Sequence, residues 1–198
     1  MQKLKLPSVT LICLTNRDFE GHKKAIDKSC EGIEFGGVKL IWDESIKNID
    51  DWNYKIIYEL HHYVQTDYAL LIHADGYVIN PQLWTNDWLS YDYIGAPWPL
   101  PSDNYSYRTP EGELIRVGNS VSLRSKKILE GPSKLSLGWK AFYNNTNEDG
   151  FLCVHNRKAL EAEECRFAPL EVAKSFSKEH EIEENKGLET FAFHTVDQ

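Results

Sequence analysis

The stretch DYALLIHADGYVINP, residues Asp67–Pro81, decides how the rest of the chain is interpreted. Tyr68–Ile72 form a short apolar and aromatic run bounded by polar residues, which predicts a buried strand. The strand is followed by His73-Ala74-Asp75-Gly76, so a carboxylate stands at its exit beside a residue that tolerates unusual turns. Ligands of open α/β sheets collect at the carboxyl ends of strands, which makes Asp75 a candidate metal or ligand contact. Taken alone, Asp75-Gly76 is equally consistent with a simple turn.

Length and composition predict a soluble globular protein. The chain has 198 residues, of which 41% are hydrophobic and 26% are charged, and this fits a single domain over residues 1–198. The formal net charge of −8 argues against binding to a nucleic-acid backbone or an anionic membrane surface. No segment approaches the roughly 20 apolar residues of a membrane span. A phosphate-bearing ligand would therefore need a metal ion or a few local cations to neutralise it.

The cysteines indicate a reducing compartment. Cys13, Cys30, Cys153 and Cys165 are widely spaced and form no CxxC pair, so we expect free thiols and a cytoplasmic location. Pro7 interrupts the N-terminal apolar run, and no small-residue cleavage site follows it. This run is better interpreted as a first core strand than as a signal peptide.

The first 80 residues alternate predicted strands and helices. Apolar runs predict strands at 9–14, 38–42 and 68–72, and periodic patterns predict helices at about 18–30 and 50–64. We expect a turn at Gly36-Gly37, and a cap at Asp50 or Asp51 for the second helix. Its apolar residues form one face, whereas Asn53, Lys55 and Glu59 lie largely off it. The β-α-β order predicts parallel strands, as in half of a doubly wound nucleotide-binding sheet.

The second half of the chain is less periodic. Short helices are predicted from Asn80-Pro81, from Ser125 to Leu129 and at about 170–176. The aromatic segment 91–99 suits packing, and less commonly sugar binding, while 100–113 is predicted to be a surface loop and candidate lid. Residues 115–125 are extended, and Gly118 permits close approach of a ligand or a bulge. We also predict an acidic solvated run at 179–184 and a last strand at 190–193 reaching His194.

Several of these segments together resemble a known family. HADGYVINPQLW, YDYIGAPWP, VGNSVSLRS, NEDGFLC and FAPLEVAKSFS are similar to a small group of GT-A type glycosyltransferases. Members occur in bacterial surface-polysaccharide loci and in large DNA viruses that glycosylate their own capsids. The resemblance covers nearly the whole chain. It implies an α/β fold with a Rossmann-like nucleotide-binding half at about 1–80, an acceptor and catalytic half at about 81–198, and a mixed central sheet flanked by helices. Such a unit can stand alone or be one domain of a longer transferase.

The resemblance also implies a reaction and the residues that carry it. A nucleotide-sugar, most simply a UDP-sugar, would donate its sugar to a glycan or glycoconjugate acceptor, with inversion. Asp75 and His194 would hold Mn²⁺ or Mg²⁺ against the diphosphate, because hard cations prefer carboxylate and phosphate oxygens. Asp149 would be the base that deprotonates the acceptor, and Glu148 would be a second acid in the motif, more plausibly a cap or an ion-pair partner.

Further residues are candidates for the donor. Those expected to contact the donor nucleotide are Thr15, Asn16, Asp43, Asn53 and Lys55, and those in the motifs around the donor are His73, Ala74, Gly118 and Asn119. Arg124 is a candidate phosphate contact, although an arginine at a helix start is often a surface residue. The chain differs from the usual pattern twice: His73 replaces the first acid of the metal motif, and Ser120-Val121 replace consecutive glycines.

Two other functions remain open at this stage. A nucleotidyltransferase also uses a Rossmann-like sheet and an acid-bound metal, but it typically has a glycine-rich phosphate loop after the first strand. Residues 14–18, LTNRD, contain no glycine, which counts against this alternative. A non-catalytic carbohydrate-binding domain would need only the aromatic residues.

Overall fold

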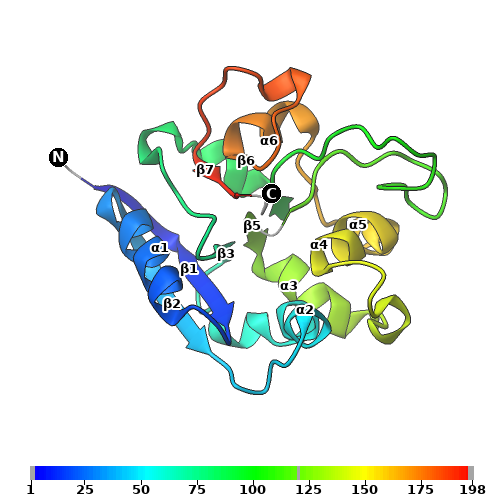
Figure 1. The fold of residues 1–198 in the computed structure, drawn as a ribbon, viewed down its shortest axis with the longest axis horizontal. Helices are drawn as coiled ribbons and strands as arrows, with labels where there is room; N and C mark the ends of the chain where they lie inside the picture. The colour runs from blue at the N-terminus through cyan, green and yellow to red at the C-terminus, as the bar shows by residue number, and fades with distance from the viewer. Residues whose placement is uncertain (1–2, 120, 196–198) are drawn as a thin grey trace.

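A mixed five-stranded sheet forms the centre of the molecule (Figure 1). The computed structural model describes residues 3–119 and 121–195, so Ser120 lies outside the described residues. The strand order is β2-β1-β3-β5-β4; β1 is parallel to β2 and β3, and β5 is antiparallel to β3 and β4. This confirms the predicted mixed sheet with a parallel N-terminal part. The strands are β1 Leu4–Thr15, β2 Ile33–Trp42, β3 Tyr68–Leu71, β4 Tyr93–Ile94 and β5 Ser122–Ser125.

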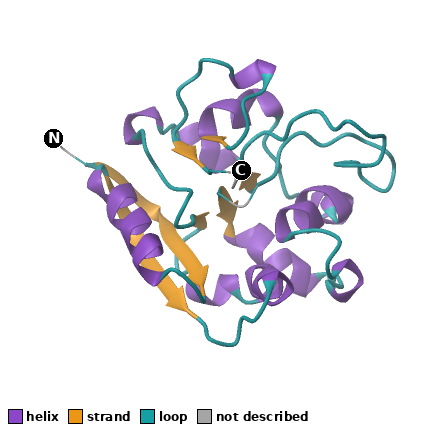
Figure 2. Cartoon of the chain, in the orientation of Figure 1, coloured by secondary structure: helices purple, strands orange, loops and turns teal. Residues whose placement is uncertain are grey.

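Helices surround this sheet (Figure 2). The α-helices are α1 Phe19–Glu31, α2 Ile49–Tyr58, α3 Lys126–Lys134, α4 Glu148–Gly150, α5 Arg157–Ala162 and α6 Leu170–Phe176. Short 3-10 helices are η1 Leu60–Tyr63, η2 Pro81–Leu83, η3 Asn86–Ser90, η4 Lys140–Phe142 and η6 Glu183–Asn185, and η5 Phe151–His155 is a π-helix. A second sheet pairs β6 Ser177–Lys178 with β7 Ala192–Phe193. In the part of the chain described here, no helix has the length and apolar character needed to cross a bilayer.

Both faces of β1 are buried, because its side chains alternate between two apolar clusters. Leu11 and Cys13 lie in the cluster that contains Ala25 of α1. Ile12 and Leu14 face the other way, into the cluster that contains Ile56 of α2. Burial on both faces explains the continuous apolar run in the sequence. Each fully buried aliphatic side chain contributes about 1.5–3 kcal/mol, so this strand anchors the edge of the sheet at which the functional residues stand.

The predicted turn at Gly36-Gly37 is wrong. Both glycines lie inside β2, which begins at Ile33. The pairing of β1 with β2 shifts register between Leu6 and Thr10, and there the carbonyl oxygen of Pro7 occupies the space that a side chain at Gly36 would need. Gly36 is therefore required by the close approach of an irregular strand, not by a turn.

The helix boundaries are corrected in two places. Asn48 caps α2 by accepting the backbone N–H of Asp51, so neither predicted aspartate is the cap. Asp50 is buried instead, and its carboxylate accepts the backbone N–H of Asn144 at 3.1 Å. Ser125 does cap α3, as predicted, but α3 continues to Lys134 beyond the expected end at Leu129. Gly131 and Pro132, which follow Leu129 in α3, are buried as well, so the helix continues past the end that the sequence predicted.

Candidate active site

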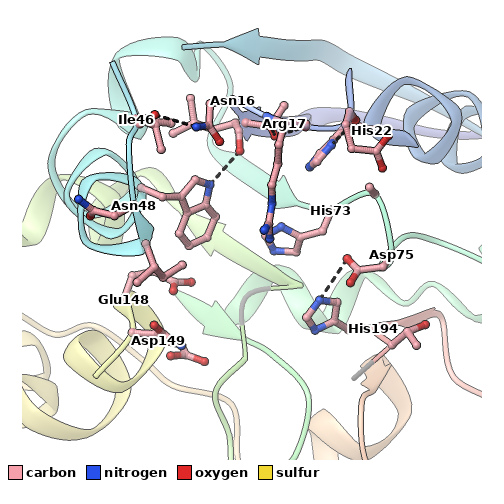
Figure 3. Close-up of a pocket in the computed structure, with 18 of the residues that line it drawn as sticks. Asn16, Arg17, His22, Ile46, Asn48, His73, Asp75, Glu148, Asp149 and His194 are labelled. Carbon is pink, nitrogen blue, oxygen red and sulfur yellow. Dashed lines mark hydrogen bonds and ion pairs between the residues drawn. The ribbon is translucent and has the colours of Figure 1, made fainter. Parts of the chain in front are cut away.

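A cavity of about 790 Å³ opens where β1 and β3 end (Figure 3). Four predicted donor-side residues line it: Thr15, Asn16, His73 and Ala74. The proposed metal residues Asp75 and His194 and the two acids Glu148 and Asp149 also line it. Residues far apart in the chain are therefore brought to one cavity at the carboxyl edge of the sheet, the location that the strand pattern predicted.

Asp75 and His194 form one end of this cavity. Nε2 of His194 lies 3.4 Å from Oδ1 of Asp75. His194 is not a loose terminal residue, because its side chain is only 18% exposed and its backbone N–H donates to the carbonyl of Lys178. Gly76 makes the approach feasible, since a Cβ there would lie 2.6 Å from Cδ2 of His194. The glycine after Asp75 thus admits the C-terminal segment and does not adopt a left-handed turn conformation.

The other nitrogen of His194 contacts a residue that the sequence did not reveal. Nδ1 lies 3.1 Å from Oε1 of Glu179, a cavity-lining residue that was predicted to belong to a solvated acidic run. That prediction is wrong for Glu179, whose side chain is only 15% exposed. Burial opposes a charge on His194, but the hydrogen bond to Glu179 and the charges of Glu179 and Asp75 outweigh it, so the pKa of His194 is raised.

The Asp75–His194 pair fits a divalent cation that shares its coordination with a substrate. Among residues 3–119 and 121–195, no group of three or more His, Cys, Asp or Glu side chains is arranged to hold a metal by itself. Mg²⁺-type sites commonly use one or two protein carboxylates and complete the shell with water and substrate phosphates. Oδ1 of Asp75 and Nε2 of His194, 3.4 Å apart, are near enough to each other to bind one cation together. A nitrogen ligand is better suited to Mn²⁺ than to Mg²⁺.

Asp149 and Glu148 stand at the start of α4, across the cavity, and differ in environment. Glu148 is 1% exposed, and its Oε1 lies 2.7 Å from Nη2 of the fully buried Arg124. This confirms Glu148 as an ion-pair partner. Asp149 is half-buried and accepts backbone N–H groups from Asn119 at 3.1 Å and Gly150 at 2.7 Å.

The pKa of Asp149 is raised to about 7. Burial is the main cause, and the negative charge of Glu148 adds to it, while the hydrogen bond from Gly150 and the charge of Arg124 oppose it. A base is most effective when its pKa lies near the operating pH. Of the two acids, Asp149 is therefore the one whose environment suits proton transfer, and Glu148 is the one fixed in a structural pair.

Arg17 and His22 are cavity residues that the sequence analysis missed. Arg17 follows the exit of β1, and its backbone N–H donates to Oγ1 of Thr15. Its guanidinium has no ion-pair partner within residues 3–119 and 121–195. His22, one turn into α1, is 7% exposed, and its Nδ1 contacts the carbonyl of Asp18 at 2.8 Å. The position of Arg17 directly after a strand exit was the signal that could have identified it.

Three predicted nucleoside contacts lie outside the cavity lining. Lys55 and Asp43 form an ion pair of 2.8 Å, and Lys55 also lies 3.1 Å from Glu59. The bond to Lys55, with help from Ser45, lowers the pKa of Asp43 to about 2. Asn53 is fully buried and does not lie off the packed face as predicted. Its Oδ1 accepts the backbone N–H of Glu148 at 3.0 Å, so it supports the start of α4.

Three other candidate donor contacts, at Arg124, Gly118 and Asn119, also lie outside the cavity lining. Arg124 is neither a surface residue nor part of the cavity lining, because burial places its guanidinium against Glu148. Gly118 is buried and is not among the cavity-lining residues, and the indole of Trp98 fills the space that a side chain there would need. Asn119 is 2% exposed and lies behind the lining, where it contacts Asp149.

The fold defines a class. A crystal structure titled as a glycosyltransferase involved in the glycosylation of the major capsid of PBCV-1 is similar to this chain, with a TM-score of 0.57 and 12% sequence identity. The match covers 97% of this chain and 94% of that chain. At this identity the similarity shows the fold, so the protein has a glycosyltransferase-like α/β fold with a mixed five-stranded sheet.

A family model also matches the chain. The family model described as "Protein of unknown function (DUF5672)" matches residues 42–194, and the chain belongs to this family. A comparison with curated proteins finds no match. The matched region includes Asp75, Asp149 and His194, but not the β1 exit with Thr15 and Arg17.

Proposed function

We propose that the protein is a metal-dependent, inverting glycosyltransferase of the GT-A type. It would transfer a sugar from a nucleotide-sugar, most simply a UDP-sugar, to a hydroxyl of a glycan or glycoconjugate. The observation that carries this proposal is one cavity with a carboxylate–imidazole pair at one end and a carboxylate of pKa about 7 at the other. The first suits a cation and diphosphate, and the second suits removal of a proton.

Each side of the cavity would have its own role. Asp75 and His194 would hold Mn²⁺ or Mg²⁺, which supplies Lewis-acid neutralisation of the leaving diphosphate when bound. Arg17 would offer positive charge and N–H donors to phosphate or ribose oxygens from the β1 side, and His22 lies beside it in the lining. Asp149 would accept the proton of the acceptor hydroxyl as it attacks the anomeric carbon. Trp52, whose Nε1 donates to Leu14 at 2.8 Å, gives the cavity a rigid wall.

The acceptor is proposed at the level of chemical class. The structural neighbour is titled as acting in the glycosylation of a viral capsid, and for this chain a surface glycoconjugate is the corresponding acceptor. The described cysteines form no disulfide, which supports a reducing, cytoplasmic setting for the reaction.

The test is a screen of UDP-sugars and other nucleotide-sugars with Mn²⁺ and with EDTA, measuring release of the nucleoside diphosphate. We expect Mn²⁺-dependent release that is abolished by EDTA, and a product of inverted anomeric configuration. A nucleotidyltransferase would instead join a sugar phosphate to a nucleoside triphosphate and release pyrophosphate from the triphosphate. Glycan binding that EDTA does not affect, without release of a nucleoside diphosphate, would identify a carbohydrate-binding domain and overturn the proposal.

A further inference from the structure

Glu179 and His194 are held side by side by the small second sheet. Strands β6 and β7 run parallel with Lys178 opposite Phe193, so the residue that follows each strand emerges beside the other. Two strands of this length are marginal by themselves. They are supported here by Phe176 and Phe191, which precede the two strands, lie next to each other and are fully buried in the main core. The core therefore fixes the contact between Nδ1 of His194 and Oε1 of Glu179.

The other oxygen of Glu179 is used as well. Oε2 accepts a hydrogen bond from the side-chain amide of Asn119. The backbone N–H of Asn119 donates to Oδ2 of Asp149 at 3.1 Å, and its Oδ1 accepts the backbone N–H of Val121 at 3.1 Å. Asn119 has a φ of 76°, a left-handed conformation that asparagine tolerates better than most residues. Its backbone and its side chain thus point to different partners.

Together these polar contacts form a continuous chain that links the two sides of the cavity, passing behind its lining at Asn119. It runs from Asp149 through Asn119 and Glu179 to His194 and then to Asp75. Figure 3 shows Asp149 on one side of the cavity and the Asp75–His194 pair on the other. Asn119 is 2% exposed and Glu179 is largely covered, so water does not compete freely for these bonds.

We infer that Asn119 and Glu179 are positioning residues, forming a bridge that fixes the metal-side pair relative to the base. This inference rests on the proposed function. A carboxylate bonded to the second nitrogen of a metal-binding histidine fixes its tautomer and ring orientation. Transfer also requires the base and the diphosphate site to be aligned to within about 0.5 Å. The bridge supplies both constraints with one carboxylate.

A bridge through Asn119 makes a prediction that a local action of Glu179 on His194 does not make. Asn119 is not a partner of Asp75 or His194 in the described contacts, yet loss of its side chain should weaken the metal site because Glu179 loses one of its two anchors. Asn119→Gly is the suitable variant, since glycine keeps the left-handed backbone and the N–H that Asp149 accepts.

The experiment measures Mn²⁺ affinity by electron paramagnetic resonance in the presence of UDP, with urea unfolding of each variant as a check on folding. We expect Glu179→Gln to lower the affinity about 10-fold or more. Asn119→Gly should lower it in the same direction, and the double variant should be no worse than Glu179→Gln alone. Glu181→Gln is the matched control, because Glu181 lies on the same segment with a 58% exposed side chain; its affinity should equal that of the wild type.

The outcomes are distinct. Wild-type affinity in Asn119→Gly, or effects of the two variants that multiply, would overturn the bridge while leaving the proposed function standing. Absence of Mn²⁺ and UDP binding in the wild-type protein would overturn the proposed function itself. Should Asn119→Gly prove unfolded in the urea check, Glu179→Gln against Glu181→Gln decides, and equal affinities in those two variants would overturn the inference.

Discussion

Arg124 and Glu148 form an ion pair of 2.7 Å in which neither side chain is more than 1% exposed. Glu148 immediately precedes Asp149, the proposed base, in the chain. The guanidinium also donates to Oγ of Ser122 and contacts the hydroxyl of Tyr93. The pair therefore joins β5 and β4 to the start of α4. It fixes the position of Asp149, and its two charges act on the pKa of Asp149 in opposite directions.

Breaking this pair should destabilise the fold strongly. Removal of one partner leaves an uncompensated buried charge, so we expect Arg124→Met to lower the free energy of unfolding by about 3–5 kcal/mol. Urea denaturation measures this, with Arg166→Met as the control, because Arg166 is exposed and only stacks over Tyr91. Adding Glu148→Gln to Arg124→Met should recover part of the loss. A loss below about 1 kcal/mol for Arg124→Met would contradict a stabilising role for the buried Arg124–Glu148 pair.

Asp149 should give the reaction an acidic limb. With its pKa raised to about 7, mainly by burial, the ionised base forms as the pH rises through 7. We expect kcat/KM at pH 6 to be about one tenth of its plateau value. Asp149→Asn should keep nucleotide binding, lower transfer by about 10²–10⁴-fold at the plateau pH, and remove the acidic limb. Equal loss of donor binding and transfer would argue against the role of base.

The same carboxyl should make stability depend on pH in a defined direction. The native state holds the proton up to about pH 7, while the unfolded chain loses it near 3.8, so the native state binds more protons between these values. The contribution of Asp149 to the free energy of unfolding must then fall as the pH rises from about 4 to about 7. Asp149→Asn should remove this part of the dependence, which urea titrations at pH 5 and pH 8 would show.

Asp75 should be required for metal-dependent stabilisation. Ligand at 100 times its Kd raises the free energy of unfolding by about 2.7 kcal/mol, and we expect this gain with Mn²⁺ and UDP in the wild-type protein. Asp75→Ala should lose it. Asp67→Ala, at the opposite end of β3 and exposed, should keep it. Thermal unfolding with and without EDTA makes the comparison, and an unchanged shift in Asp75→Ala would exclude this residue from the metal site.

Gly118 should be intolerant of a side chain. A Cβ there would overlap the indole of Trp98, so we expect Gly118→Ala to cost about 1–3 kcal/mol. Gly138→Ala, where a Cβ meets nothing within 4 Å, should change stability by less than about 0.5 kcal/mol. Urea unfolding compares the two. A tolerated Gly118→Ala would return this glycine to a role in ligand binding.

The sequence predicted those parts of the site that local patterns determine. Thr15 and Asp75 were found because apolar runs locate strand ends, and the ends of parallel strands share one edge of a sheet. Asp149 was proposed from the resemblance of NEDGFLC to a family motif, and the structure places it in the cavity lining. The bounds of α6 at Leu170–Phe176 also follow from its local pattern.

What could not be predicted depends on partners distant in the chain. Arg124 is buried because Glu148 neutralises it, and Gly118 is a glycine because Trp98 packs on it. Glu179 belongs to an acidic run, and only the pairing of β6 with β7 turns it inward. A local pattern gives the hydrophobicity of a segment, but it does not state which tertiary neighbour faces it.

The residues that line the cavity come from most of the length of the chain, from Thr15 at the end of β1 to His194 after β7. A ligand that touches both ends would therefore act as a non-covalent clasp between the first and last strands. Amide hydrogens deep in β1 and in β7 should then exchange more slowly together when it binds, because opening either strand requires the ligand to leave. A ligand in this cavity would thus affect the stability of the whole molecule as well as supply its chemistry.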